Sequence, residues 1–366
     1  MAFTGNIGEW SEAYTLFKVL ADKNLYIGDE NLEKISGLMH PVIKVLRSEA
    51  DGNFEYAIDS DLVIVSSNGH EICRISVDTF KQYAELTLTL LKQKKIASTS
   101  TKSAFELPEI EGFLNQLNCK SLKASSSAKT DITIVIHDVK TNQKPYLGYS
   151  IKSQLGSAST LLNPGKTTNF VFTLEGGMTD AEMVAINAID SRRKIKERMN
   201  QIMDLGYKLK FQNILNPMFS NNLTLIDSQM PEIVSQLLAC FYCSSESSIA
   251  TIVDTLEKEN PLKFDTANSH KFYTYKIKRL LTDIAVGLMP SKKWNGVYDT
   301  TGGYLIVKDT GDILCYHLYD RNQFEDYLFN NTKLDTASTS RFDFGNIYKV
   351  EDKYYIKLNL QIRFNR

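Results

Sequence analysis

The sequence has almost no net charge, and this limits how it can meet a polyanion. Its 42 lysines and arginines nearly balance 43 aspartates and glutamates, which gives a formal net charge of −1. No global positive field therefore draws the chain to nucleic acid, so any nucleic-acid surface must be a local patch. Apolar residues make up 43% of the 366 residues, which predicts a buried core in two domains or in one large elaborated domain.

Cysteines are few, and their placement argues against a disulfide framework. The five thiols lie at positions 73, 119, 240, 243 and 315, an odd number in a long chain. Cys240 and Cys243 form a single CxxC, and no second cysteine pair completes a zinc site. We therefore expect core thiols in preference to a metal or redox role.

Long hydrophobic runs are also missing. The N-terminus has no basic stretch followed by an apolar one, as a secretory signal would have. No uninterrupted apolar run approaches the length that spans a membrane. We therefore expect a cytoplasmic protein with no membrane partner.

The most informative stretch that is present is residues 130–153. It predicts an antiparallel hairpin, because two strand-like runs flank a polar turn. The predicted strands are 131–136 and 147–153, and the predicted turn is 142–145. Side chains alternate between the two faces of a strand, so Ser150 and Lys152 share one face of the second strand. If that face coincides with the face that carries Asp131, the carboxylate and the ammonium group converge at one end of the sheet.

An aspartate beside a lysine supports phosphodiester hydrolysis when a hard cation such as Mg²⁺ is bound. The carboxylate would hold the metal, the metal would activate water, and the lysine would stabilise negative charge or assist deprotonation. The arrangement resembles the PD-(D/E)xK nuclease motif, with Asp131 as its first acid and Lys152 as its lysine. Thr130 stands in place of the proline, and Ser150 in place of the second acid. A surface hairpin with an exposed Asp and Lys is the alternative.

A predicted helix over residues 5–22 offers an acid to replace the one missing at Ser150. Its apolar residues follow helical spacing and predict an amphipathic helix with one apolar face. Glu9 and Glu12 are three residues apart and project on neighbouring sides of this helix. Either could act as the second Mg²⁺ ligand, and we prefer Glu12. The alternative is a pair of solvated glutamates near a helix N-terminus.

Several polar and basic segments are candidates for contact with DNA. Residues 119–170 hold seven lysines against two aspartates, and residues 271–293 hold six basic residues against one aspartate. The polar segments 163–170 and 338–345 can donate hydrogen bonds to phosphates or base edges. The residues predicted to contact DNA are Lys144, Lys166, Thr168, Asn169, Lys276, Lys278, Arg279, Ser340 and Arg341. Solvated faces, an ordinary turn and an arginine paired with a carboxylate are the alternatives.

The rest of the chain predicts an α/β, or α+β, fold in which helices flank a mixed central sheet. Residues 29–47 are expected to be helical or mixed. A capping box at Thr179 opens a helix that is expected to reach residue 205. Its basic residues at 192–198 are interleaved with apolar ones, which predicts one solvated face and one core face. Further strands are expected at 54–66, 71–75, 170–174, 304–307, 313–319 and 354–358, and further helices at 78–95, 108–117 and 230–259. The polar break at 98–103 and the strand-rich composition from Trp294 onward lead us to divide the chain into an N-terminal region (1–100), a nuclease core with DNA-facing helices (101–290) and a strand-rich C-terminal region (291–366). A second polar break at 125–127 precedes the hairpin.

Seven stretches together resemble the HpaII-type family of Type II restriction endonucleases. They follow one another along nearly the whole chain: 8–12 (GEWSE), 148–156 (GYSIKSQLG), 168–170 (TNF), 302–304 (GGY), 315–317 (CYH), 338–341 (STSR) and 358–364 (LNLQIRF). The resemblance implies a restriction-endonuclease-like core, Mg²⁺-dependent cleavage of double-stranded DNA and a place in a restriction–modification system beside a cognate DNA methyltransferase. We also expect a homodimer.

The resemblance assigns Asp131 as a metal ligand and Lys152 as the catalytic lysine. Glu12, Glu9 and Gln154 are the candidates for the acidic position that Ser150 leaves open. The candidate catalytic residues are thus Asp131, Lys152, Glu12, Ser150 and Gln154, and the candidate metal ligands are Asp131, Glu12 and Glu9.

Two other functions are compatible with these residues. Ser150 in the acidic position also fits a non-catalytic DNA-binding protein on a nuclease-like fold. A structure-selective repair or junction nuclease would use the same hairpin but would cut according to DNA shape rather than sequence.

Overall fold

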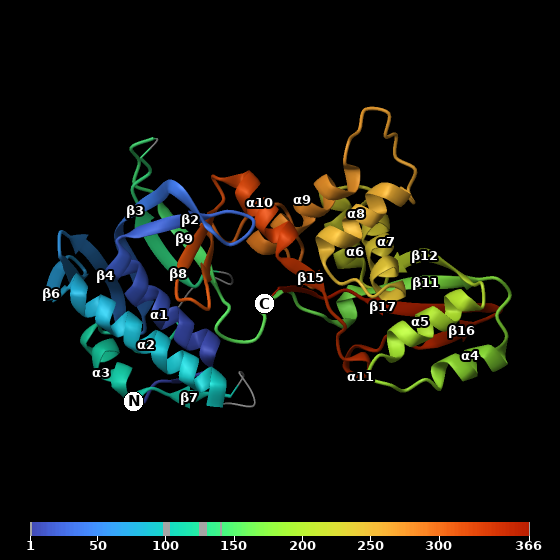
Figure 1. Cartoon of the computed structure of the whole chain (residues 1–366), viewed down its shortest axis with the longest axis horizontal. Helices are drawn as coiled ribbons and strands as arrows, with labels where there is room; N and C mark the ends of the chain where they lie inside the picture. Colours follow the sequence, from blue (N-terminus) through green and yellow to red (C-terminus); the bar gives the residue numbers. More distant parts are fainter. Residues whose placement is uncertain (1, 98–102, 124–129, 140, 366) are drawn as a thin grey trace. The chain divides into compact units, whose positions relative to one another are not determined.

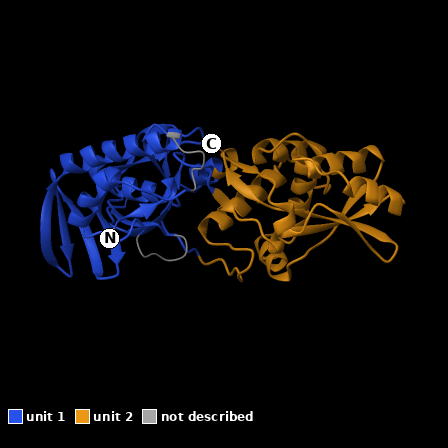
Figure 2. Cartoon of the chain, turned by 90° about the horizontal axis from the view of Figure 1, so that it is seen from below, with its two compact units in different colours: residues 1–159, 298–327, 366 blue, residues 160–297, 328–365 orange. Residues whose placement is uncertain are grey.

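The computed structural model describes residues 2–97, 103–123, 130–139 and 141–365 (Figure 1). The chain divides into two compact units (Figure 2). Unit 1 comprises residues 1–159, 298–327 and 366, and unit 2 comprises residues 160–297 and 328–365. The hairpin therefore lies in unit 1 together with the N-terminal region. The predicted breaks at 98–103 and 125–127 lie, apart from Ser103, outside the described residues.

Unit 1 contains one mixed sheet, which confirms the predicted fold class. Within the described residues its strands follow the order β2-β14-β13-β9-β8-β3-β4-β5-β6. β13 runs parallel to β9 and β14 parallel to β2, and the other neighbours are antiparallel. β3 also pairs with β2, so the pairings from β2 through to β3 close into a ring. The strands are β2 (Asn24–Gly28), β3 (Lys34–Glu49), β4 (Gly52–Asp59), β5 (Leu62–Ser67), β6 (His70–Ser76), β8 (Ile132–Ile136), β9 (Tyr146–Ser153), β13 (Gly303–Val307) and β14 (Ile313–His317).

The prediction that residues 29–47 are helical or mixed is wrong, because most of them belong to strand β3. Gly37 and Pro41 both disfavour a strand locally. The strand forms nevertheless because three partners, β2, β4 and β8, pair with successive parts of it. Its buried valines, Val42 and Val45, enter the core.

Three helices of unit 1 pack with this sheet, as the sequence predicts (Figure 1). They are α1 (Ile7–Asp22), α2 (Val77–Ala97) and α3 (Pro108–Gln116), and a short pairing of β1 (Thr4–Gly5) with β7 (Phe105–Glu106) lies beside them. Aromatic side chains join the three helices. The ring of Phe113 on α3 lies 5.1 Å from that of Phe17 on α1 and 4.0 Å from that of Tyr83 on α2. These contacts make one core out of helices that are distant in sequence.

Helix α1 begins at an Asn6 N-cap. The Asn6 side chain accepts a hydrogen bond from the Glu9 amide at 3.1 Å, and the Glu9 carboxylate accepts one from the Asn6 amide at 2.8 Å. The expectation of a single apolar face is wrong, because Ser11 and Thr15 are buried as well. Their hydroxyls can be buried because each donates to a carbonyl one turn earlier, at 2.7 Å. Helix α1 is thus packed on most of its surface, and Glu12 is half-buried within it.

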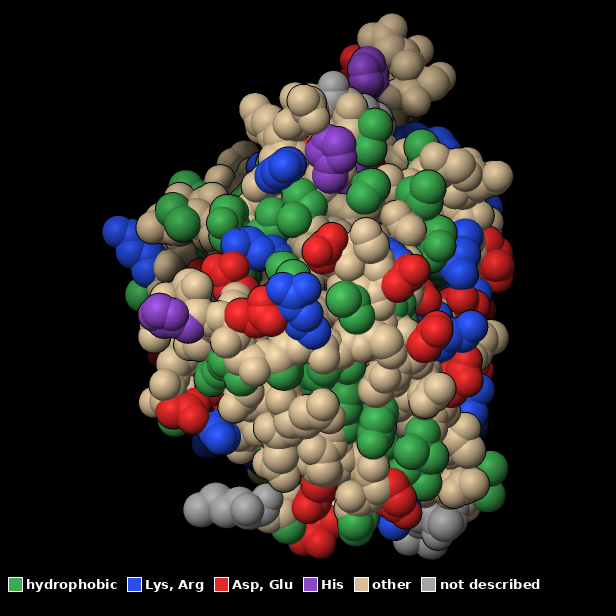
Figure 3. Space-filling model, turned by 90° about the vertical axis from the view of Figure 1, so that its left-hand side faces the viewer, with side chains coloured by type: hydrophobic (Ala, Val, Ile, Leu, Met, Phe, Trp, Pro, Cys, Tyr) green, Lys and Arg blue, Asp and Glu red, His purple; other side chains and the backbone are tan. Residues whose placement is uncertain are grey.

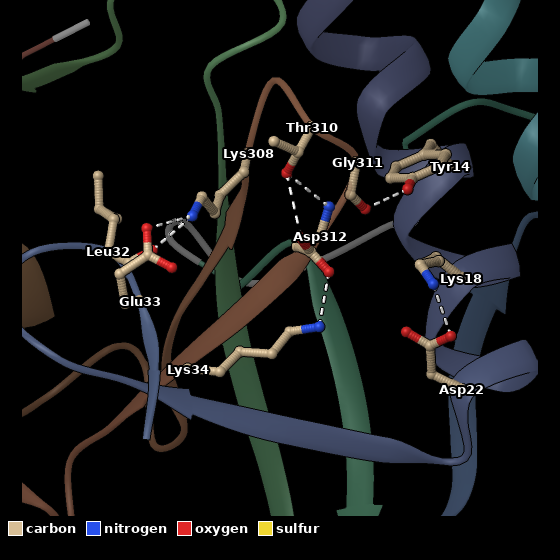
Figure 4. A network of polar contacts seen from close by, with 10 residues as sticks. All are labelled: Tyr14, Lys18, Asp22, Leu32, Glu33, Lys34, Lys308, Thr310, Gly311 and Asp312. Atoms are coloured by element: carbon tan, nitrogen blue, oxygen red, sulfur yellow. Dashed lines mark hydrogen bonds and ion pairs between the residues drawn. The ribbon is translucent and has the colours of Figure 1, made fainter. Parts of the chain in front are cut away.

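A network of polar contacts ties α1 and β3 to the turn between β13 and β14 (Figure 4). The Tyr14 hydroxyl on α1 donates to the Gly311 carbonyl. Lys34 on β3 forms an ion pair of 2.6 Å with Asp312. Because β13 is the direct neighbour of β9, this network fixes the helix that carries Glu12 against the strands that carry the hairpin side chains.

Unit 2 contains two antiparallel sheets and most of the remaining helices. Within the described residues, one sheet has the order β12-β11-β17-β16 and the other the order β10-β18-β15. The strands are β10 (Thr160–Leu162), β11 (Asn169–Glu175), β12 (Lys208–Ile214), β15 (Thr332–Leu334), β16 (Ile347–Val350), β17 (Lys353–Asn359) and β18 (Ile362–Phe364). The helices are α4 (Asp180–Asn187), α5 (Lys194–Asp204), α6 (Pro217–Ile226), α7 (Met230–Cys243), α8 (Ile249–Glu259), α9 (Phe272–Val286) and α11 (Thr339–Phe342), and α10 (Arg321–Asn330) spans the division between the units.

The single helix predicted over residues 179–205 is in fact two helices, α4 and α5. Thr179 does cap α4 with the predicted capping box. The helix ends early because the Arg198 guanidinium donates hydrogen bonds to the carbonyls of Asn187 and Ile189, both at 2.7 Å. A side chain from α5 thereby satisfies carbonyls at the end of α4 that would otherwise need a further helical turn. The block predicted at 230–259 is likewise two helices, α7 and α8.

The surface has the mixed charge that the composition predicts. On the face shown in Figure 3, lysines and arginines are interspersed with aspartates and glutamates, and neither sign covers a broad area. Among the described residues, no helix has both the length and the apolar character that crossing a membrane requires.

We predict that Gly303→Ala strongly destabilises unit 1. Gly303 begins β13 with a φ of +108°, and an added Cβ would lie against the Tyr316 carbonyl oxygen of the paired strand. Strain and clash together should cost roughly 2–4 kcal/mol of unfolding free energy. Gly69→Ala is the matched control, because Gly69 has a φ of +79° with nothing within 4 Å of the added Cβ. Chemical denaturation measures both, and equal losses would contradict the clash.

Candidate active site

The structure contains the predicted antiparallel hairpin. β8 and β9 are antiparallel, with Ile132 opposite Tyr149 and Thr133 opposite Gly148. The Asp131 amide extends the pairing with a hydrogen bond of 2.8 Å to the Tyr149 carbonyl. Asp131 therefore lies beside Ser150 at one end of the paired strands.

Ser150 links the predicted carboxylate to the predicted lysine. Its hydroxyl donates to Asp131 Oδ2 at 3.0 Å and accepts from Lys152 Nζ at 2.9 Å. The Ile151 amide donates to the same Asp131 oxygen at 2.7 Å. The three predicted side chains are thus joined in one chain of hydrogen bonds, and Ser150 itself is buried.

Glu12 from α1 joins this cluster. Burial raises the pKa of its carboxyl group from 4.5 to about 8, and the nearby negative charge of Asp131 adds to the rise. The positive charges of Lys123 and Arg47 oppose the rise. Neither oxygen of Glu12 has a hydrogen-bond or ion-pair partner among the described residues. The structure therefore places a second carboxyl group close enough to Asp131 to feel its charge.

The Lys152 ammonium group lies between these carboxylates and an aromatic ring. Burial lowers its pKa, while the charges of Asp131 and Glu12 oppose that change. Its Nζ lies 5.1 Å from the centre of the Tyr304 ring. Tyr304 reaches this position because β13 pairs in parallel with β9 and sets Tyr304 beside Ser150. No local sequence signal marked Tyr304 as part of the site, since its place depends on a pairing between distant segments.

The two other residues proposed for the acidic position make different contacts. One oxygen of Glu9 caps α1, and the other forms an ion pair of 3.1 Å with Lys123. Gln154 lies one residue beyond β9, where its amide donates to the Val307 carbonyl at 2.9 Å. Its side chain makes no polar contact with any described residue. The geometry therefore favours Glu12 over both.

Two residues predicted to contact DNA are buried inside unit 2. Asn359 donates to Thr168 Oγ1 at 3.1 Å and to Asn169 Oδ1 at 2.7 Å, and the Asn169 amide group donates to the Phe342 carbonyl at 2.9 Å. These contacts favour the alternative of an ordinary turn for this loop. Lys144 in unit 1 and Lys166 in unit 2 are exposed, and two further lysines of the basic run, 129 and 140, lie outside the described residues.

The basic residues of α9 have partners within unit 2. Lys276 pairs with Asp227, Arg279 lies 3.8 Å from Asp283, and Lys278 Nζ lies 5.3 Å from the centre of the Phe329 ring. These side chains are thus engaged within unit 2, and their contact with DNA stays a prediction. Ser340 and Arg341 on α11 are both exposed.

The cluster in unit 1 has the donors that Mg²⁺ prefers. This ion binds hard oxygen ligands and is held by one or two carboxylates together with water and substrate phosphate. Asp131 and Glu12 supply two such carboxylates, and the repulsion that helps to raise the pKa of Glu12 is what a divalent cation would relieve. Among the described residues, no group of three or more His, Cys, Asp or Glu side chains forms a metal cage. Cys240 and Cys243 are free thiols and are only half-buried.

An aspartate, a lysine and a helix-borne glutamate at one end of a mixed sheet are groups suited to phosphodiester hydrolysis with a divalent cation. A family model described as HpaII restriction endonuclease matches residues 6–364. The Type II restriction enzyme HpaII of Haemophilus parainfluenzae is 44% identical over 364 residues, which cover 99% of each chain. No solved structure matches. The chain belongs to the HpaII restriction endonuclease family, which confirms the resemblance and the prediction of a Type II restriction endonuclease, a site-specific deoxyribonuclease.

The raised pKa of Glu12 predicts a pH-dependent gain in stability for Glu12→Gln in the presence of EDTA. The unfolded chain loses this proton near pH 4.5 and the folded chain only near pH 8, so wild-type stability falls as the pH rises between these values. The melting temperature of the variant should therefore exceed that of the wild type by an amount that grows from pH 5 to pH 8. Glu85→Gln, at an exposed site on α2, should follow the wild type at every pH. A constant difference between Glu12→Gln and wild type would mean that Glu12 ionises like an exposed glutamate.

Proposed function

We propose that the chain hydrolyses phosphodiester bonds of double-stranded DNA at a specific sequence, with Mg²⁺ held by Asp131 and Glu12. The observation that carries the proposal is the convergence of these two carboxylates with Lys152 at one end of the sheet. The 44% identity to a Type II restriction enzyme supports the same reaction.

Asp131 is oriented to hold a cation. The Ser150 hydroxyl and the Ile151 amide both donate to its Oδ2, which leaves Oδ1 with no hydrogen-bond partner among the described residues. Glu12 must lose a proton before it can share the cation. When bound there, Mg²⁺ would neutralise charge on the scissile phosphate and lower the pKa of the attacking water.

Lys152 supplies positive charge to the reacting phosphate. Its ammonium group is held by the Ser150 hydroxyl, so its position is set before DNA binds. A carboxylate at position 150 would add a third negative charge beside Asp131 and Glu12. A neutral serine therefore fits a site in which α1 provides the second acid, and Ser150 acts as a positioning residue for both of its neighbours.

The biological setting follows from the reaction. A nuclease that cuts a short sequence also threatens the genome of its own cell, so we place it in the cytoplasm beside a cognate methyltransferase that protects the same sites. We further propose a homodimer, because two copies related by a two-fold axis match the two strands of a symmetric DNA site.

Cleavage of unmodified phage DNA tests the active site. Wild type with Mg²⁺ should give discrete fragments, EDTA should abolish them, and DNA modified by the cognate methyltransferase should resist. Asp131→Asn, Lys152→Met and Glu12→Gln should each lower the rate by roughly 10²–10⁴-fold, because each removes a charge that holds the cation or stabilises the reacting phosphate. Glu9→Gln is the matched control and should keep the rate within about tenfold of wild type, since Glu9 already caps α1.

The same experiment separates the alternatives. Cleavage that survives Asp131→Asn and Lys152→Met would place the active site elsewhere. Tight binding without cleavage under any condition would indicate a non-catalytic DNA-binding protein. Cutting only at branched DNA, with linear duplex left intact, would indicate a structure-selective nuclease.

The Mg²⁺ requirement should depend on pH. Below a pH of about 8 the Glu12 carboxyl group keeps its proton, so the cation must displace that proton in order to bind. The Mg²⁺ concentration for half-maximal cleavage should then rise by up to about tenfold for each unit of pH below 8. Steady-state cleavage at pH 6.5, 7.5 and 8.5 measures this, and a requirement that is independent of pH would remove Glu12 from the metal site.

A further inference from the structure

Unit 2 contains a basic groove that the proposed active site does not use. Its volume is about 640 Å³, and three segments of unit 2 line it: residues 191–196, Ser245 and residues 336–339. Its lining is rich in cations (Arg192, Arg193, Lys194 and Lys196) and in hydroxyl groups (Ser191, Ser245, Thr336, Ser338 and Thr339). None of the described residues that line it is acidic, and only Ile195 and Ala337 are apolar. The groove is therefore suited to an anionic, polar ligand.

Two of these cations lack the partners that other basic side chains of unit 2 have. Arg192 and Arg193 are exposed, and neither makes an ion pair or a side-chain hydrogen bond with any described residue. Elsewhere in the unit such pairs are common: Lys194 with Asp190, Lys210 with Glu175, Lys276 with Asp227, Lys349 with Asp180, Lys357 with Asp343 and Arg363 with Asp335. In a protein of nearly zero net charge, two adjacent guanidinium groups without partners mark a local positive site.

The other basic residues of this segment show how the charge is concentrated. Arg198 is buried and donates to acceptors inside the unit, so it belongs to the structure rather than to the groove. Lys196 is held at the groove wall by a 2.8 Å hydrogen bond to the Ser244 carbonyl. Burial lowers the pKa of Lys196, and the positive charge of Arg193 lowers it further, against an opposing effect of Glu246. Like charges thus crowd together here, and an anion would relieve the crowding.

Two further features add to the attraction for anions. Helix α5 begins at Lys194 with no side-chain cap, so the positive end of its dipole contributes to the groove. The opposite wall, at 336–339, continues into α11, where Ser340 and Arg341 are exposed. The polar side chains that line the groove are arginines, lysines and hydroxyl-bearing residues. Its chemistry fits phosphate groups, which arginines and hydroxyls contact without regard to sequence.

We infer that this groove binds the phosphodiester backbone of duplex DNA, with Arg192 and Arg193 as its principal contacts. The inference rests on the proposed function, which supplies duplex DNA as the substrate, and it adds a sequence-independent contact in unit 2 to the reacting site in unit 1. The groove thus holds DNA through charge and hydrogen bonding and takes no part in the hydrolysis.

Binding of two duplexes by the full-length protein tests the groove. One 30-base-pair duplex contains a mapped cleavage site and the other lacks it, and fluorescence anisotropy in EDTA follows binding from 50 to 300 mM NaCl. The double variant Arg192→Gln/Arg193→Gln should bind both duplexes roughly tenfold or more weakly, and the slope of log affinity against log salt should fall by about two. Arg192→Lys/Arg193→Lys should restore most of the affinity and the slope, because it restores the charge.

Lys208→Gln/Lys210→Gln is the matched control, since it removes two exposed lysines from β12 of the same unit. It should change affinity by less than about twofold, and all variants should melt at the wild-type temperature. Wild-type affinity in Arg192→Gln/Arg193→Gln, or an equal loss in the control, would overturn the inference. A loss confined to the duplex with the cleavage site would also overturn it, because base reading would then be responsible. A wild type that binds DNA but never cuts it would instead overturn the proposed function. The affinities of the variants for DNA would still test the groove.

Discussion

The register of β8 against β9 is the constraint on which the candidate site depends. A strand that slips by one residue turns every side chain to the opposite face, so a shift here would send Ser150 and Lys152 away from Asp131. The backbone hydrogen bond from the Asp131 amide to the Tyr149 carbonyl extends the strand pairing as far as Asp131. The parallel pairing of β13 on the other side of β9 then adds Tyr304. β13, β9 and β8 belong to a closed ring of strand pairings, so β8 and β9 each have a second partner strand that supports the register.

The second constraint is electrostatic. Two carboxyl groups and one ammonium group lie together, and burial disfavours the charged forms of Glu12 and Lys152. Within the protein alone this arrangement is unfavourable, because the nearby positive charges do not offset the burial of the Glu12 carboxylate. A divalent cation and a phosphate group would complete the balance, since the cation pairs with the carboxylates and the phosphate with the lysine. The proposed binding of a cation and a phosphate group therefore explains the cluster better than a contribution to stability does.

We assign the proposed hydrolysis to unit 1 and the inferred phosphate contacts to unit 2. Unit 1 holds the proposed reacting groups in a rigid sheet, while its other ionic groups are largely paired or interspersed with the opposite sign (Figure 3). Unit 2 places in one groove two arginines that have no ion-pair or side-chain hydrogen-bond partner among the described residues. This division explains how a chain with a net charge of −1 can engage a polyanion, because a local site needs only a few cations that no carboxylate neutralises.

The sequence by itself determined the elements whose signals are local. The strand and turn signals of residues 131–153 were enough to predict the hairpin that carries Asp131, Ser150 and Lys152, and the capping box at Thr179 marked the start of α4. The seven stretches of family resemblance were enough to place the chain in its family. Only the tertiary structure decided which glutamate faces Asp131, that residues 34–49 form a strand, and that Thr168 and Asn169 are buried. The physical reason is the same in each case. Propensity and side-chain alternation act within one segment, whereas burial and pairing depend on partners in other segments, which no local pattern specifies.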